Sequence, residues 1–151
     1  MRAVIQRVSR ASVEVDRSMI ASISKGFMIL IGIEHEDSHA DIDWIKSKAI
    51  KLRIFDDEDG KMNLDINQIQ GDVILVSQFT LHASCKKGNR PSFIKAAKPV
   101  MAEKLFNKMV SEFRMELGEN RVQTGQFGAM MDVDFVNDGP VTILLDSKVK
   151  E

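Results

Sequence analysis

Apolar and polar residues along the first third of the chain follow the pattern of β-strands. Residues 3–8 are rich in apolar side chains, and Val13 and Val15 alternate with polar neighbours. A short apolar stretch at residues 20–23 follows a polar link, as in a hairpin. Residues 27–33 are apolar on both faces, so we predict a strand in the centre of a sheet there.

Two later segments have the spacing of helices. From Asp41 to Phe55, apolar residues recur every three or four positions, which places them on one helical face. Ser38, followed three residues later by Asp41, resembles a capping box at the start of this helix. A second helix is predicted from Pro99 to about Leu117, because proline suits the first turn and the apolar residues again share one face.

Strands return in the middle and at the end of the chain. The apolar run from Val73 to Phe79 predicts one strand. Residues 131–135 alternate strictly and residues 141–145 nearly so, and Asn137-Asp138-Gly139-Pro140 between them is a dense turn signal. We therefore predict a single α/β domain over residues 1–151, with a mixed, largely antiparallel sheet and two main helices.

Size and composition narrow the class of protein. A chain of 151 residues buries roughly two thirds of its unfolded surface in one domain. No stretch approaches the roughly 20 apolar residues of a membrane helix, and the first residues lack the apolar core of a signal peptide. Cys85 is the only cysteine, which excludes an internal disulfide and favours a cytoplasmic setting.

Charge leaves nucleic-acid binding open. A net charge of −1 argues against a globally basic binder, but affinity for phosphates depends on where the positive charges lie. A loop from about Ser84 to Lys98 contains the clear basic cluster, which either binds phosphates or is simply solvated. Its cations are Lys86, Lys87, Arg90, Lys95 and Lys98. Eight Phe, one Trp and no Tyr are too few aromatic residues for a broad stacking surface.

The segment Ser77-Gln78-Phe79-Thr80 places two hydroxyl groups at the end of an apolar strand. A serine or threonine nucleophile needs a base, most often histidine. On a continued strand His82 would share a face with Thr80, because side chains alternate, but no nearby acid is an obvious partner to orient it. The alternative is that Ser77 and Thr80 bond to local backbone at the strand end.

Three other features carry weaker signals for chemistry. His35 and His39 have the spacing of metal ligands on a helix, but their acidic neighbours equally suit the positive end of a helix dipole. Cys85 lies beside two lysines that would favour its thiolate, although no histidine accompanies it. Gly125-Gln126-Phe127-Gly128 lacks the third glycine and the following helix of a dinucleotide-binding loop. We predict neither a metal nor a cofactor.

Five blocks of sequence, spread over nearly the whole chain, are informative together. They are Met1–Val8, Ser77–Leu81, Gly88–Phe93, Thr124–Ala129 and Asn137–Thr142. In this order they resemble the D-aminoacyl-tRNA deacylase family, in the form that is widespread in bacteria and eukaryotes. Coincidence does not account for several specific motifs at once.

The resemblance implies a cytoplasmic homodimer that hydrolyses the ester between a D-amino acid and the 3′-terminal adenosine of tRNA, and that also accepts glycyl-tRNA. The Gly139–Pro140 bond would be cis, and the pair would enter the partner's active site and face Ser77, Gln78, Phe79 and Thr80. Its backbone would hold the substrate's α-amino group and leave no room for an L side chain. Arg7 would lock that segment in place, and Phe127 and Met131 would line the adenine pocket.

The resemblance leaves the attacking group open. Either the hydroxyl of Thr80 is the nucleophile, or the terminal ribose 2′-hydroxyl helps to activate water, and the missing His–acid pair fits the second view better. Backbone N–H groups of Phe79 and Thr80 would stabilise the oxyanion. The basic residues Lys86, Lys87 and Arg90 would meet the acceptor phosphates of tRNA.

Three alternatives remain beside this interpretation. A related deacylase branch with a trans Gly–Pro bond removes L-alanine from mischarged tRNA. A non-catalytic RNA- or partner-binding module would keep the fold without turnover. A metal hydrolase would use His35 and His39. His82 stands where the family more often has Tyr or Phe, and Cys85 is not a family hallmark, but neither is expected to alter the reaction.

Overall fold

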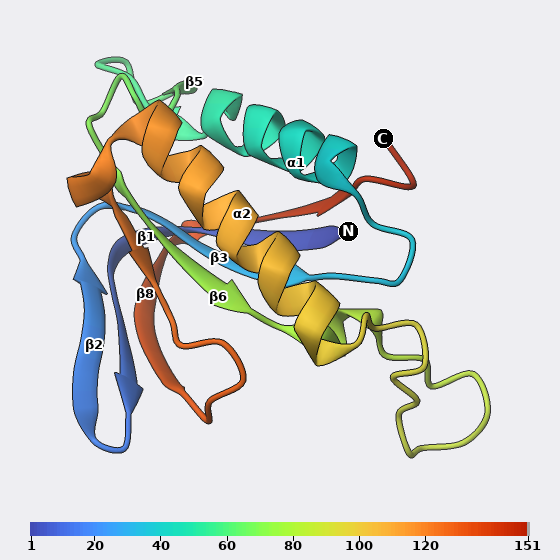
Figure 1. Ribbon diagram of the computed structural model, residues 1–151. Coiled ribbons are helices and arrows are strands. Elements are labelled where there is room, and N and C mark those ends of the chain that lie inside the picture. The colour runs from blue at the N-terminus through green and yellow to red at the C-terminus, as the bar shows by residue number, and fades with distance from the viewer. Residues whose placement is uncertain (151) are drawn as a thin grey trace.

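Two helices lie on one face of a mixed sheet (Figure 1). The computed structural model describes residues 1–150, and within that part of the chain the main sheet has six strands. A separate two-stranded ladder joins β4 (Phe55–Asp56) to β5 (Met62–Leu64). The predicted α/β class with two main helices is confirmed.

Strand β1 (Arg2–Val15) organises the sheet. Along one edge its first half pairs with β3 (Gly26–Gly32) and its second half with β2 (Ser18–Ile23), and along the other edge it pairs with β8 (Asp132–Asp146). All three pairings are antiparallel. The two apolar stretches expected before residue 16 are therefore one continuous strand.

Two parallel pairings complete the sheet. β6 (Asp72–Ser77) pairs with β3, and β7 (Val122–Thr124) pairs with β6. A one-turn 3₁₀ helix, η2 (Glu119–Arg121), precedes β7. The sheet is therefore mixed but largely antiparallel, as predicted.

The first helix, α1 (His39–Lys51), is shorter than the predicted segment that reached Phe55. Its start is as expected, since the backbone N–H of Ser38 donates to Asp41 Oδ2 at 2.8 Å. Its end differs because Leu52 adopts extended backbone angles and Phe55 pairs with Leu64. Apolar spacing alone did not distinguish the last helical turn from the start of this ladder.

The second helix, α2 (Pro99–Leu117), has the predicted bounds, with proline in its first turn. Together α1 and α2 cover a core cluster on one face of the sheet, which includes Ile5, Ile29 and Phe113. A second cluster lies between β1, β2, β3 and β6 and includes Val13, Ile23 and Ile74. Over residues 1–150, no helix is long and apolar enough to cross a membrane.

The predicted strand Val73–Phe79 ends at Ser77, which is a correction with consequences for the site. Gln78 N donates to Ile31 O at 2.7 Å, and Leu81 N then donates to Gln78 O at 3.3 Å and closes a turn. The next residues form a 3₁₀ helix, η1 (Phe79–His82). Thr80 and His82 therefore do not share the face of a strand, as the sequence pattern suggested.

The predicted turn Asn137–Pro140 is also wrong as a link between two strands, because it lies inside the single strand β8. Asn137 is opposite Val8 and Thr142 is opposite Gln6, so residues 138–141 all face the one position of Arg7. The turn signal marks a bulge of four residues opposite one, in a strand that pairs with β1 on both sides of it.

Candidate active site

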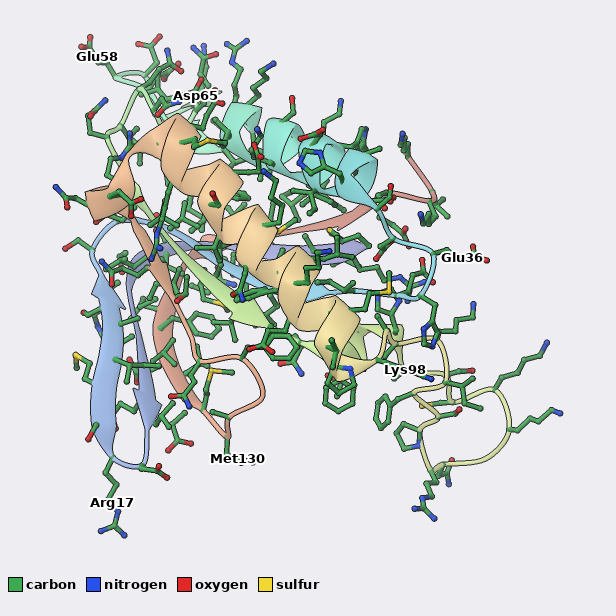
Figure 2. All side chains as sticks on the ribbon, viewed as in Figure 1. Arg17, Glu36, Glu58, Asp65, Lys98 and Met130 are labelled. Atoms are coloured by element: carbon green, nitrogen blue, oxygen red, sulfur yellow. The ribbon has the colours of Figure 1, made fainter. Side chains whose placement is uncertain are left out.

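A pocket of about 660 Å³ opens where the carboxyl end of β6 meets the start of α2 and the loop after β7. Figure 2 shows Lys98 at the start of α2 and Met130 on that loop, and both residues line the pocket. Its lining residues are Ile33, Val76, Ser77, Gln78, Phe79, Phe93, Ala96, Ala97, Lys98, Pro99, Ala102, Phe127, Gly128, Ala129, Met130, Met131 and Val133. Within the described chain, Lys98 is the one ionisable side chain among them, so the pocket holds no carboxylate or histidine to act as a base.

Ser77, Gln78 and Phe79 form one edge of this pocket, and Thr80 lies next to it. Gln78 Nε2 donates to Thr80 Oγ1 at 2.5 Å. If the amide were turned over, the threonine hydroxyl would donate to the amide oxygen instead, so in either orientation its partner is a neutral amide. The contact holds the Thr80 hydroxyl in place but does not activate it as a nucleophile.

His82 is not the missing base. Its side chain is buried, and its Nε2 has no hydrogen-bond partner in the described part of the chain. Thr80 Oγ1 is bonded to Gln78, and no bond joins it to His82. The Thr80–His82 pair considered from the sequence is therefore not formed.

Two backbone donors remain free at the edge of the pocket. The turn of η1 uses the N–H groups of Leu81 and Ala83, which donate to Gln78 O and Thr80 O. Across residues 1–150, no acceptor is found for the N–H groups of Phe79 and Thr80. Adjacent free amides of this kind can bind an anionic oxygen.

The opposite wall of the pocket is apolar. Phe127 packs against the buried ring of Phe106, with centroids 6.0 Å apart and an interplanar angle of 46°. A Cβ at Gly125 would lie 2.6 Å from the sulfur of Met131, so glycine there lets Met131 lie close to the chain. Phe127 and Met131 therefore give this wall of the pocket its apolar side chains.

Gly139, Pro140 and Arg7 form a second group outside the pocket of their own chain. The Gly139–Pro140 peptide bond is cis, and both residues are exposed. The buried guanidinium of Arg7 donates from Nη1 to Ile54 O at 2.6 Å and from Nε to Asp138 O at 3.2 Å. Neither Gly139 nor Pro140 is among the residues that line the pocket, so one chain does not bring the two groups together.

The basic residues Lys86, Lys87 and Arg90 lie on the exposed loop between η1 and α2. Figure 1 shows this loop extending from the body of the molecule. Ser84 and Ser92 close it through two backbone hydrogen bonds of 2.8 and 2.9 Å. None of the three cations lines the pocket, and Cys85 is exposed on the same loop.

The histidines considered as metal ligands have other partners. His35 Nε2 lies 3.2 Å from Ile94 O, and His39 Nδ1 lies 3.1 Å from Asp43 Oδ2. In the portion of the chain described, no three His, Cys, Asp or Glu side chains are grouped to hold a metal ion.

Three residues at the site are not among the predicted site residues, although Phe93 and Asp138 lie within two of the five sequence blocks. Phe93 lies edge to face with Phe79. The sequence feature that points to it is a single aromatic residue in an otherwise basic loop. Asp138 and Ile54 hold Arg7 from positions far apart in the chain, which no local pattern reveals.

The family comparison and the relatives found by sequence agree on one family. The family described as D-Tyr-tRNA(Tyr) deacylase matches residues 4–146. A D-aminoacyl-tRNA deacylase of Christiangramia forsetii is 59% identical over 150 residues, which are 99% of each chain. A D-aminoacyl-tRNA deacylase of Flavobacterium psychrophilum is 56% identical over 151 residues, which are 100% of each chain.

Solved structures resemble the whole fold. A c-Myc DNA unwinding element binding protein superposes with a TM-score of 0.92 at 39% identity, and the match covers 97% of this chain and 98% of that one. A probable eukaryotic D-amino acid tRNA deacylase superposes with a TM-score of 0.80 over 95% of this chain and 97% of that one. The second pair is 15% identical, so it supports the fold alone.

Proposed function

Because the chain belongs to the D-Tyr-tRNA(Tyr) deacylase family, it is a D-aminoacyl-tRNA deacylase, and we propose that its pocket binds the 3′-terminal adenosine together with the esterified amino acid. The observation that carries this assignment is a single pocket in which Ser77, Gln78 and Phe79 face the apolar wall of Phe127 and Met131. The wall suits adenine, and the polar edge with its free amides suits the ester.

The reaction needs little from the protein because an aminoacyl ester is already reactive. Water attacks the ester carbonyl carbon, and the carbonyl oxygen takes up negative charge that the N–H groups of Phe79 and Thr80 stabilise. The tetrahedral intermediate then breaks its bond to the ribose 3′-oxygen, which leaves as the 3′-hydroxyl of tRNA, and the D-amino acid is released. No carboxylate or histidine lines the pocket, so in this proposal the neighbouring ribose 2′-hydroxyl assists the water.

Chirality is selected by exclusion in this proposal. Gly139 and Pro140 of a second copy of the chain close the pocket, hold the α-amino group with backbone atoms and occupy the space of an L side chain. A D side chain points to solvent, so the pocket does not contact it and does not distinguish one D-amino acid from another. Glycine has no side chain to exclude, so glycyl-tRNA is a substrate by the same argument.

A second copy of this chain is the partner that the site requires. Gly139 and Pro140 are exposed and lie outside the pocket of their own chain, which supports a role for them at the pocket of another copy. The outer edge of β8 has no strand partner in the described chain, and Leu144 on β8 is 75% exposed. A hollow of about 370 Å³ beside it is lined by Val4, Leu81 and Leu144, among others. These features support a homodimer with active sites at its interface.

The remainder of the tRNA is held by charge in this proposal. Lys86, Lys87 and Arg90 on the exposed loop suit the phosphates of the acceptor end. Aminoacyl-tRNA is used in the cytoplasm, and we place the enzyme there.

The assignment is tested by incubating catalytic amounts of the protein with D-Tyr-tRNA, Gly-tRNA and L-Ala-tRNA, with and without EDTA. We expect multiple turnovers on D-Tyr-tRNA and Gly-tRNA, little on L-Ala-tRNA, and no effect of the chelator. Binding of tRNA without turnover would instead indicate a non-catalytic module. Loss of activity in EDTA would indicate a metal hydrolase, and preference for L-Ala-tRNA would indicate the related L-alanine branch.

A further inference from the structure

Phe93 is an aromatic residue at the mouth of the pocket that the proposed chemistry does not use. Its ring lies edge to face with Phe79, with centroids 5.1 Å apart and an interplanar angle of 76°. Phe93 is 36% exposed and Phe79 is 56% exposed, so the pair keeps much of its ring surface open to solvent. Both residues line the pocket.

The loop that carries Phe93 is strongly positive. Residues 84–98 contain five cations and no Asp or Glu. The cations are Lys86, Lys87, Arg90, Lys95 and Lys98, and all of them are exposed. An exposed aromatic ring among cations is the combination that binds single-stranded nucleic acid, because bases stack on the ring while the cations attract the backbone.

Two different loops supply the aromatic side chains on the two sides of the pocket. Phe127 and Met131 come from the loop after β7, whereas Phe93 comes from the loop between η1 and α2. Figure 1 shows these loops as separate projections at the same end of the molecule. If the terminal adenine occupies the first side, the open ring on the second side is left for the neighbouring nucleotide.

We propose that Phe93, supported by Phe79, is a second stacking site, which binds the penultimate nucleobase of the tRNA 3′ end. The inference rests on the proposed function, and it adds a binding site for a second nucleotide. Lys98, at the rim of the pocket, lies where it can meet the phosphate that joins the two nucleotides. Stacking on a ring reads no base edges, so the site tolerates different bases.

The test compares the D-tyrosyl esters of adenosine and of the dinucleotide CpA. For the wild type we expect kcat/KM on the CpA ester to exceed that on the adenosine ester by about tenfold, the effect of one stacked base. In Phe93→Ala and Phe93→Leu this ratio should fall towards one, and in Phe93→Trp it should recover, because an aromatic face is required and apolar bulk alone is insufficient. Ile94→Ala is the matched control: it changes the next residue, which is 84% exposed and outside the pocket, and should keep the wild-type ratio.

Calorimetric titration with uncharged CpA and adenosine measures the same preference without catalysis. Tighter binding of CpA by the wild type, lost in Phe93→Ala, supports the second site even if no ester is hydrolysed. Failure to hydrolyse either ester counts against the proposed function alone. The second site is overturned if the wild type gains nothing from the added cytidine, or if Phe93→Ala keeps the full gain.

Discussion

The guanidinium of Arg7 on β1 lies directly against Gly139 on β8. Its Nη2 is 3.0 Å from the point that a Cβ on Gly139 would occupy, and the Val141 side chain is 2.8 Å from the same point. Gly139 also has φ +119°, a conformation that L side chains rarely adopt. A side chain at position 139 would therefore strain the backbone and displace Val141 or Arg7, which flank Pro140 in the bulge.

Gly139→Ala should lower kcat/KM on D-aminoacyl-tRNA by about 100-fold, because a small displacement of groups that position a substrate costs rates of this order. Gly60→Ala is the matched control, since Gly60 also has a positive φ of 73° but no atom within 4 Å of an added Cβ. Gly60→Ala therefore reports the cost of a left-handed backbone without a contact, about 1–2 kcal/mol, and Gly139→Ala, at φ +119°, carries at least that cost. Equal kcat/KM values for the two variants would show that position 139 is outside the site.

Mixing two inactive variants should restore activity if each site draws on two chains. Gly139→Ala alters the Gly139–Pro140 pair, which is proposed to enter the pocket of the partner chain. Ala129→Trp places a bulky side chain in the lining of the chain's own pocket. When the two are unfolded and refolded together in equal amounts, about a quarter of all sites combine two unaltered halves. Deacylation of D-Tyr-tRNA should reach about that fraction of the wild-type rate, and a mixture as inactive as its parts would argue for a site within one chain.

Thr80→Ala should retain kcat within about tenfold of the wild type, whereas loss of a true nucleophile costs about a millionfold. The reason is that the Thr80 hydroxyl pairs with the amide of Gln78, and no base lies beside it. Single-turnover hydrolysis of D-Tyr-tRNA measures this directly. Abolished turnover with unchanged tRNA affinity would make Thr80 the attacking residue.

The contact between the two helices should depend on pH through Glu112. Hydrogen bonds from Lys108 and Lys46 lower the pKa of Glu112 from 4.5 to about 2. A lowered pKa in the folded state means that this charge stabilises the fold above pH 4.5, and that the contribution is lost as the pH falls from 4.5 to 2.

Urea unfolding of the wild type and Glu112→Gln at pH 7, 5, 4 and 3 measures this contribution. The wild type should be the more stable at pH 7, and the difference should shrink below pH 4.5. Glu116→Gln, at an exposed position on the same helix, should show no such trend. A difference between wild type and Glu112→Gln that stays constant down to pH 3 would contradict the assignment.

The sequence predicted elements best where local chemistry determines them. The Ser38–Asp41 capping box and Pro99 at the start of α2 both follow from side chains that act within one turn. The predicted end of α1 is wrong because Phe55 pairs with Leu64 in a short antiparallel ladder. The spacing of apolar residues does not reveal this partner. The turn signal at Asn137–Pro140 was read as a link between strands because the continuous pairing of β8 with β1 is set by residues far away in the chain.

The candidate site was partly predictable for a similar reason. Ser77, Phe127 and Met131 meet in one pocket although they lie far apart in sequence, and only the resemblance to a family linked them beforehand. Strand β6 ends at Ser77, Gln78 N donates to Ile31 O on the neighbouring strand β3, and Thr80 and His82 then lie together in η1 instead of on a continued strand. Such contacts across strands leave no local signal.

Selection of the D configuration is measured by the initial rates of hydrolysis of D-Tyr-tRNA and L-Tyr-tRNA made from the same tRNA. The two substrates differ only in the configuration of one carbon atom, so the ratio of rates isolates selection by exclusion. We expect the D ester to be hydrolysed at least about 100 times faster, because an L side chain would meet Gly139 and Pro140 of the partner subunit. Equal rates on the two esters would contradict it.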